Sequence, residues 1–198
     1  LHTYGEDVKT KARAYAAAGS DARMNGCSLP VIICSGSGNQ GITASVPVIV
    51  YARELGIDQD RLYRALLVSN LATIHQKTGI GRLSAYCGAI SAGCGSGAGI
   101  AYLMGDGYEV IAHTLVNSLA IVSGIICDGA KASCAAKIST AVDAGLMGYA
   151  MYKQGQQFFA GDGIVAKGIE ANITNIGLLA KEGMRETDKE ILTIMTGK

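Results

Sequence analysis

The stretch "VIICSGSGNQGITASVPVIVY", residues 31–51, decides between two folds for this chain. Its glycines form the pattern G-x-G-x-x-G, which binds dinucleotide phosphates when a strand precedes it and an uninterrupted helix follows. A dinucleotide fold also needs an acidic residue at the end of a second strand, about 20 residues on. Here Pro47 is expected to break or kink the following helix, and Glu54 lies in "YARELGID", which is typical of a helix end. The sequence therefore disfavours a dinucleotide site.

Two interpretations of this loop stay open. Its glycines either form a structural turn or expose backbone amides to another anion, such as a small carboxylate. Polar side chains in the loop add hydrogen-bonding groups for such an anion: Ser35, Ser37, Asn39 and Gln40. These four residues are the candidate substrate-binding residues of the loop.

Composition sets the class of protein. The chain has 198 residues, of which 49% are hydrophobic and 17% are charged, and its net charge is +1. This length suffices for one sizeable core, so we expect a single domain over residues 1–198. The near-neutral charge argues against nucleic acid as a partner. We also expect that the chain is a fragment or a processed product, because it starts with leucine.

Three segments lack charged side chains: 24–52, 83–105 and 110–127. Their length would allow a membrane span, but their glycines, serines, His113 and Asn117 indicate buried helices instead. We therefore expect no membrane partner and a cytoplasmic location. Runs rich in β-branched residues are limited to "VIIC" and "VPVIVY", and there is no strand–helix alternation.

Helical patterns cover most of the remaining chain. Gly19 and Gly79 are expected to end helices. The D-x-x-E pattern that begins at Asp106 and the T-x-x-E pattern that begins at Thr187 are expected to form capping boxes at helix starts. The predicted helices are 6–18, 60–77, 107–124, 133–152, 162–181 and a short terminal helix from residue 187. The predicted fold is all-α, a single globular domain of buried, glycine- and alanine-rich helices around a common core.

The six cysteines do not resemble a disulfide framework, since the chain is long and apolar. Small thiols filling a tight core explain Cys27 and Cys34. Cys127 and Cys134 flank "DGAKAS". They lie either two helical turns apart on one face, or on a turn at Gly129 that brings both sulfurs to one centre. Their spacing matches no standard zinc or ferredoxin pattern.

Three motifs together resemble one family. "SGSGNQGITASVPV", "CGAISAGCGSGAG" and "CDGAKASC" occur in this order in proteins similar to the L-serine dehydratase alpha chain and L-cysteine desulfidase. The resemblance runs from about Met24 to the C-terminus. It implies an all-α region, an oxygen-sensitive 4Fe-4S cluster held by three cysteines, no pyridoxal phosphate, and conversion of L-serine or L-cysteine into pyruvate and ammonia.

The resemblance also implies cluster ligands. Cys127 and Cys134 match the two downstream ligands, and the short gap between them resembles the desulfidase branch. The first ligand is Cys87 or Cys94. Cys87 is preferred because it lies 40 residues before Cys127, closer to the family's spacing than the 33 residues from Cys94. The loop at 35–40 resembles the family's substrate loop, which favours the carboxylate-binding interpretation.

Three protein thiolates leave one iron open to act as a Lewis acid on the leaving oxygen or sulfur. The base for the Cα proton is not evident. His75 and His113 are candidates by residue type, although a hydrogen-bonded structural role is favoured for each. Lys131 is either a substrate-carboxylate contact or a surface charge. In the desulfidase branch, the base is expected in an N-terminal portion that this chain lacks.

The resemblance further implies an N-terminal domain or a beta-type partner, and it leaves homo-oligomer formation open. The main alternative function is a non-enzymatic iron–sulfur or redox-sensing helical module. A dinucleotide-binding oxidoreductase and a purely structural helical subunit are the remaining alternatives. Neither the preference for serine or cysteine nor the oligomeric state follows from the sequence.

Overall fold

Helices make up the regular structure of the computed structural model, which describes residues 3–197. They are α1 (Val8–Met24), α2 (Gly38–Glu54), α3 (Gln59–Ile80), α4 (Gly88–Leu103), α5 (Tyr108–Val122), α6 (Cys134–Lys153), α7 (Ile169–Leu178) and α8 (Arg185–Thr196), with a π-helical turn, Leu179–Gly183, before α8. Within residues 3–197 there is no strand, only two isolated β-bridges. The prediction of an all-α single domain is confirmed.

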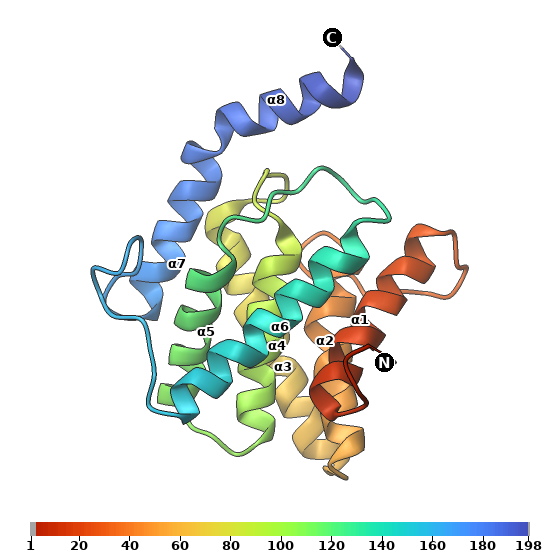
Figure 1. The fold of residues 1–198 in the computed structure, drawn as a ribbon, viewed down its shortest axis with the longest axis vertical. Coiled ribbons are helices and arrows are strands. Elements are labelled where there is room, and N and C mark those ends of the chain that lie inside the picture. Colours follow the sequence, from red (N-terminus) through yellow and green to blue (C-terminus); the bar gives the residue numbers. More distant parts are fainter. Residues whose placement is uncertain (1–2, 198) are drawn as a thin grey trace.

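Helix α4 runs through the centre of the bundle, between α3, α5 and α6 (Figure 1). Glycines at alternate positions let two neighbours approach its backbone. A Cβ at Gly93 would lie 2.4 Å from the carbonyl carbon of Ala141 in α6, and a Cβ at Gly95 would lie 2.6 Å from the carbonyl oxygen of Ser69 in α3. Because no side chain separates these backbones, the glycine-rich sequence of α4 determines how closely its neighbours pack.

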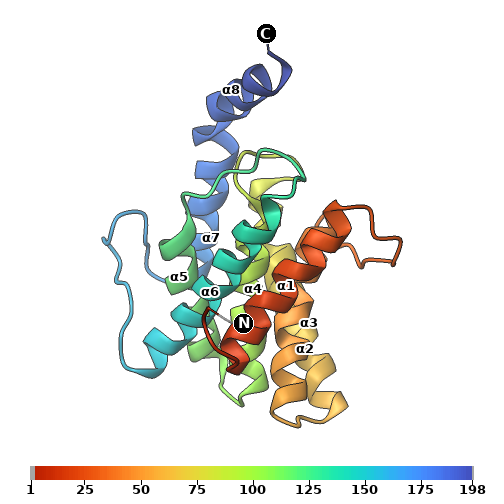
Figure 2. The same ribbon diagram turned by 45° about the vertical axis from the view of Figure 1, so that its right-hand side comes forward.

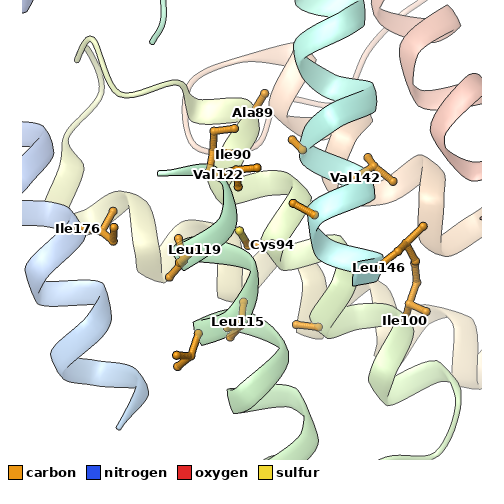
Figure 3. Packing of buried hydrophobic residues seen from close by; sticks show 14 of the residues in the cluster. Ala89, Ile90, Cys94, Ile100, Leu115, Leu119, Val122, Val142, Leu146 and Ile176 are labelled. Atoms are coloured by element: carbon orange, nitrogen blue, oxygen red, sulfur yellow. The ribbon is translucent and has the colours of Figure 1, made fainter. Parts of the chain in front are cut away.

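The hydrophobic core surrounds α4. Figure 3 shows apolar side chains of α4, α5 and α6 packed together, with Cys94 facing Leu115 and Leu119 of α5. Cys94 and Ile100 are fully buried, as are Ile138 and Val142 of α6. Helix α4 is buried along nearly its whole length, which explains why its sequence carries no charge.

Two glycines expected to end helices lie inside them instead. Helix α1 continues through Gly19, which packs against Ile42 of α2, and ends at Asn25. Helix α3 continues through Gly79, whose Cβ position is 3.3 Å from the Cα of Gly177 in α7. The predicted ends were wrong because close helix contacts, and not chain reversal, account for both glycines.

The C-terminal third also differs from its prediction. Residues 162–168 form a loop, because Gly163 and Gly168 have φ of 62° and 85°, which a right-handed helix excludes. Neither predicted capping box forms. Asp106 accepts hydrogen bonds from Tyr149 and Lys153 instead of capping α5, and Thr187 lies inside α8.

Helix α2 continues through Pro47, so the expected break there was wrong. Glu54 is the last residue of this helix, as its sequence pattern indicated. Among the described helices, none combines the length and the apolar character that crossing a membrane requires.

The helix ends that matter for function meet at one end of the bundle. Figures 1 and 2 show the amino-terminal ends of α4 and α6 beside the carboxy-terminal end of α3, on the side from which α8 extends. Helix α2 joins them, since a Cβ at Gly88 would lie 2.3 Å from Nε2 of Gln40. Three helix amino termini, each with a partial positive charge, therefore point toward the same end of the molecule.

Candidate active site at the cysteine end of the bundle

Two loops bring Cys87 and Cys127 together. The backbone amide of Cys127 donates to the carbonyl of Ala85 at 2.6 Å, and the amide of Cys87 donates to the carbonyl of Ile125 at 3.2 Å. A β-bridge pairs Tyr86 with Ile126 between them. These backbone bonds hold the segment before α4 against the segment after α5, so that the two thiols lie close enough to alter each other's acidity.

The two thiols have different acidities. The hydrogen bond from the Cys87 thiol lowers the pKa of Cys127, in spite of the opposing effect of burial. The same hydrogen bond, together with burial, raises the pKa of Cys87. Cys127 is therefore the thiolate of the pair and Cys87 its hydrogen-bond donor.

Two lysines that the sequence did not single out lie beside this pair. The ammonium of Lys137 donates to Asp128 at 2.5 Å. Burial lowers the pKa of Lys137, but this hydrogen bond and the charges of Asp128, Cys87 and Cys134 together raise it. Its charge also acts on Cys87 and Cys127, favouring their thiolates. Lys77 is 7% exposed, and burial lowers its pKa while the charges of Cys127 and Cys87 raise it. A usable sequence signal for Lys137 was its position one helical turn after Cys134.

Cys134 is the first residue of α6. Its thiol donates to the carbonyl of Gly129 at 3.6 Å and accepts from the amide of Lys131 at 3.5 Å. Gly129 has φ of +94°, so "DGAKAS" forms a turn and not a continuous helix, while the convergence of both sulfurs on one centre stays a prediction. Within residues 3–197, no three His, Cys, Asp or Glu side chains gather closely enough to hold a metal ion, so Cys134 as third ligand stays a prediction.

The other cysteines lie away from this pair. Cys94 is two helical turns after Cys87, in the core, where burial raises the pKa of its thiol to about 12. This position agrees with the preference for Cys87 over Cys94 as a ligand. Cys34 is buried as expected, whereas Cys27 is exposed, and its assignment to the core was wrong. Cys27 lies in the open loop after α1, where no second layer covers it.

Some polar residues of the 35–40 loop make structural contacts, and one lines a pocket. Ser37 caps α2 by accepting from the amide of Asn39 at 3.2 Å. The side chain of Asn39 is buried and accepts from Arg23 at 3.1 Å. Gln40 is buried against Gly88, and its Oε1 has no hydrogen-bond partner in the described structure. Ser35 lies in a pocket beside Lys77.

Tight packing explains one glycine of the loop. A Cβ at Gly41 would lie 1.8 Å from the carbonyl oxygen of Ile32, so only glycine fits there. This contact gives Gly41, which lies in the first turn of α2, a packing role. Lys131 is exposed, and its backbone amide contacts Cys134.

Both histidines have partners elsewhere. The Nε2 atom of His75 is 2.8 Å from the carboxylate of Glu170 in α7. The ring of His113 stacks on Tyr152 with their centres 4.3 Å apart. The contact of His75 agrees with the hydrogen-bonded structural role favoured from the sequence, whereas Nδ1 of His113 is buried without a hydrogen-bond partner among the described residues.

Comparison with known proteins finds relatives that align with almost the whole of this chain. UPF0597 protein DSY1109 of Desulfitobacterium hafniense is 73% identical over 195 residues, which are 98% of this chain and 45% of that protein. A UPF0597 protein of Finegoldia magna is 55% identical over 193 residues, 98% of this chain and 46% of that protein. A third, from Bacteroides fragilis, is 42% identical over 194 residues, 98% of this chain and 45% of that protein. The chain thus spans less than half the length of these curated relatives. No solved structure matches it.

A family model described as "Serine dehydratase alpha chain" matches residues 2–193, nearly the whole chain. The match includes both loops that pair the cysteines, and it agrees with the resemblance seen in the three sequence motifs. The chain belongs to the serine dehydratase alpha chain family.

Proposed function

We propose that this chain is the iron–sulfur-dependent lyase domain of an enzyme that eliminates water from L-serine or sulfide from L-cysteine. Membership of the serine dehydratase alpha chain family supports a lyase. The observation that carries the proposal further is the backbone pairing that brings Cys87 and Cys127 together, with two lysine side chains whose charges act on these thiols.

The cysteines of this site have the right chemistry to hold a 4Fe-4S cluster, but only two of the three lie together in this structure. Thiolates are the ligands that such clusters use, and Cys87, Cys127 and Cys134 would hold it. Lys77 and Lys137 would offset the negative charge of these thiolates, and the amino termini of α4 and α6 add to that effect. Gathering Cys134 with the other two requires a change in the 129–134 turn, which contains a glycine and is largely exposed.

Three protein ligands would leave one iron without a thiolate, and the cluster when bound would supply an electron-pair acceptor for the leaving oxygen or sulfur. The residues of the chain have the remaining tasks: to bind the amino acid, to orient its β-carbon toward the cysteines, and to limit access of water. No pyridoxal phosphate is required, because the leaving group itself is activated.

The reaction balances without an external oxidant or reductant. The Cα proton and the β-hydroxide or β-hydrosulfide leave, and a carbon–carbon double bond forms between Cα and Cβ. The resulting aminoacrylate tautomerises to an imine, and water hydrolyses the imine to pyruvate and ammonia. The base that removes the Cα proton is not assigned to a residue of this chain.

The remaining length of the relatives leaves room for further parts of the site. We propose that an N-terminal domain or a beta-type partner completes it, as the name "alpha chain" of the family suggests. We expect a small amino acid as substrate, a cytoplasmic location, and neither nucleic acid nor membrane as a partner. Homo-oligomer formation is compatible with the proposal.

Anaerobic reconstitution with iron and sulfide tests it. We expect visible absorption near that of 4Fe-4S proteins, an EPR signal after reduction, and pyruvate production from L-serine or L-cysteine by the protein that contains this chain. A cluster that responds to oxidants without any turnover would instead favour the redox-sensing alternative. If neither a cluster nor pyruvate is detected, the proposal fails.

A further inference from the structure

A pocket of about 800 Å³ opens at the carboxy-terminal end of α3, and it is lined by Lys77, on which the charges of Cys87 and Cys127 act. The carboxy-terminal turn of α3, the segment that follows it and the turn before α2 form its walls. The residues that matter for its chemistry are Ser35, Gly36, Lys77, Thr78 and Arg82. The pocket therefore joins the loop that resembles a substrate loop to a helix end that the sequence motifs did not include.

The pocket carries positive charge. Lys77 and Arg82 both line it, and none of its lining residues is acidic. Within residues 3–197, no carboxylate lies within ion-pair distance of either side chain, whereas other lysines, such as Lys137 and Lys153, are paired. The electrostatics of this pocket therefore favour an anionic ligand.

Lys77 is the informative residue. It is 93% removed from solvent, yet its ammonium forms no hydrogen bond or ion pair with any described residue. Its ammonium nitrogen is not among the fully buried polar atoms that lack a partner, so this charge reaches solvent at the pocket, where it can pair with a ligand of opposite charge. The exposed part of its side chain faces the pocket.

Lys77 also connects the pocket to the cysteines. Its ammonium is close enough to Cys87 and Cys127 for their charges to act on it. In serine or cysteine, the carboxylate carbon and the leaving atom are separated by only about 3–4 Å. A substrate whose carboxylate pairs with Lys77 is therefore short enough for its leaving atom to stay in the neighbourhood of the thiols.

We infer that Lys77, assisted by Arg82 at the pocket rim, binds the α-carboxylate of the amino-acid substrate. This inference rests on the proposed function and deepens it, because it names the positive charge that selects the substrate. It places the carboxylate in the pocket beside Ser35 and Gly36. The side chains of Ser37 and Asn39 are already used in capping and packing. Lys131, which is exposed in the 129–134 turn, is then a surface charge.

The test replaces Lys77→Met, which removes the charge and keeps the stem, and Lys77→Arg, which keeps the charge. Lys181→Met, at an exposed position outside this pocket, is the matched control. Calorimetry on the cluster-free form of the full-length protein that contains this chain measures binding of L-serine and of L-serinamide, which lacks the carboxylate. Circular dichroism checks the fold of each variant.

We expect the wild type to bind L-serine more tightly than L-serinamide, and Lys77→Met to weaken L-serine binding by about 10- to 100-fold while leaving L-serinamide nearly unchanged. Lys77→Arg and Lys181→Met should keep the wild-type discrimination. In the reconstituted enzyme, Lys77→Met should raise KM more than it lowers kcat and should retain the cluster absorption.

Several results would overturn the inference without affecting the lyase. Equal binding of L-serine and L-serinamide by the wild type would do so, as would a Lys77→Met enzyme with a wild-type KM. If Lys77→Met does not fold, Arg82→Met at an exposed position provides the second test, with an expected loss of about 3-fold in L-serine affinity; an unchanged affinity there contradicts the inference. Loss of the cluster in the wild type itself would count against the lyase instead.

Discussion

Replacing Gly93→Ala tests whether backbone contact between α4 and α6 holds the cysteine end of the bundle together. The added Cβ would lie 2.4 Å from both the carbonyl carbon and the carbonyl oxygen of Ala141, and 2.7 Å from its Cβ. Carbon atoms in contact prefer about 3.5–4.0 Å, so the two helices would have to separate by roughly 1 Å. The obstructing atoms belong to a helix backbone and cannot rotate away.

The expected loss follows from two opposing effects. Alanine in place of glycine favours a helix by about 0.5–1 kcal/mol, whereas overpacking a core contact costs about 1–3 kcal/mol. Because backbone atoms are involved, we take the upper part of the second range. The free energy of unfolding should then fall by about 2 kcal/mol, which lowers the Tm of a chain of this length by roughly 4–8 °C.

Thermal and urea unfolding of the variant, followed by circular dichroism, measure this loss. Gly124→Ala is the control, since a Cβ there meets no atom within 4 Å and its φ is not positive; we expect its stability to change by less than about 0.5 kcal/mol. A Gly93→Ala protein as stable as the wild type, or more stable, would refute the reasoning, because helix propensity would then outweigh the contact.

Three further predictions concern the cysteines and the loop. Cys87→Ala or Cys127→Ala should abolish the 4Fe-4S absorption after anaerobic reconstitution, whereas Cys94→Ala should keep it; the reverse pattern would assign the first ligand to Cys94. Since the Cys87 hydrogen bond lowers the pKa of Cys127, the cluster-free chain should be alkylated at Cys127 at a pH below the ordinary range of a cysteine thiol. The stabilisation of the Cys127 thiolate is present at high pH and is lost as the pH falls through the lowered pKa of Cys127. The Cys87→Ala substitution should therefore move the alkylation profile of Cys127 to higher pH. Ser37→Ala should destabilise the fold by about 1 kcal/mol through loss of the α2 cap, and Ser37→Gly by only a few tenths; equal losses in urea unfolding would contradict the capping role.

Sequence reasoning succeeded where the pattern is local. The helical class followed from the charge-free, glycine- and alanine-rich segments and from the absence of strand–helix alternation, and the bounds of α6 were predicted within one residue. It failed where a glycine had two explanations. Gly19 and Gly79 were interpreted as helix ends, and both are helix contacts whose partners lie on other helices. Helix contacts of this kind leave no local signal.

The candidate site divides in the same way. The motifs around Cys87, Cys127 and Cys134 were visible in the sequence, and their order and spacing indicated the family that the comparisons show. Lys77 and Lys137 were not singled out, because lysine is a common surface residue and nothing local distinguishes a buried one. Their importance appears only when the end of α3 and the start of α6 are brought to the same end of the bundle.

By itself the sequence determined that this is a helical, glycine-rich domain with a cysteine pattern typical of one lyase family, because composition and spacing are properties of the chain. The tertiary structure decided which thiols meet and which charges surround them. Residues 40 positions apart become neighbours at Cys87 and Cys127 only through backbone hydrogen bonds between two loops. The Lys77 side chain likewise becomes buried only when α3 packs against the rest of the bundle, and this burial is what distinguishes it from other lysines.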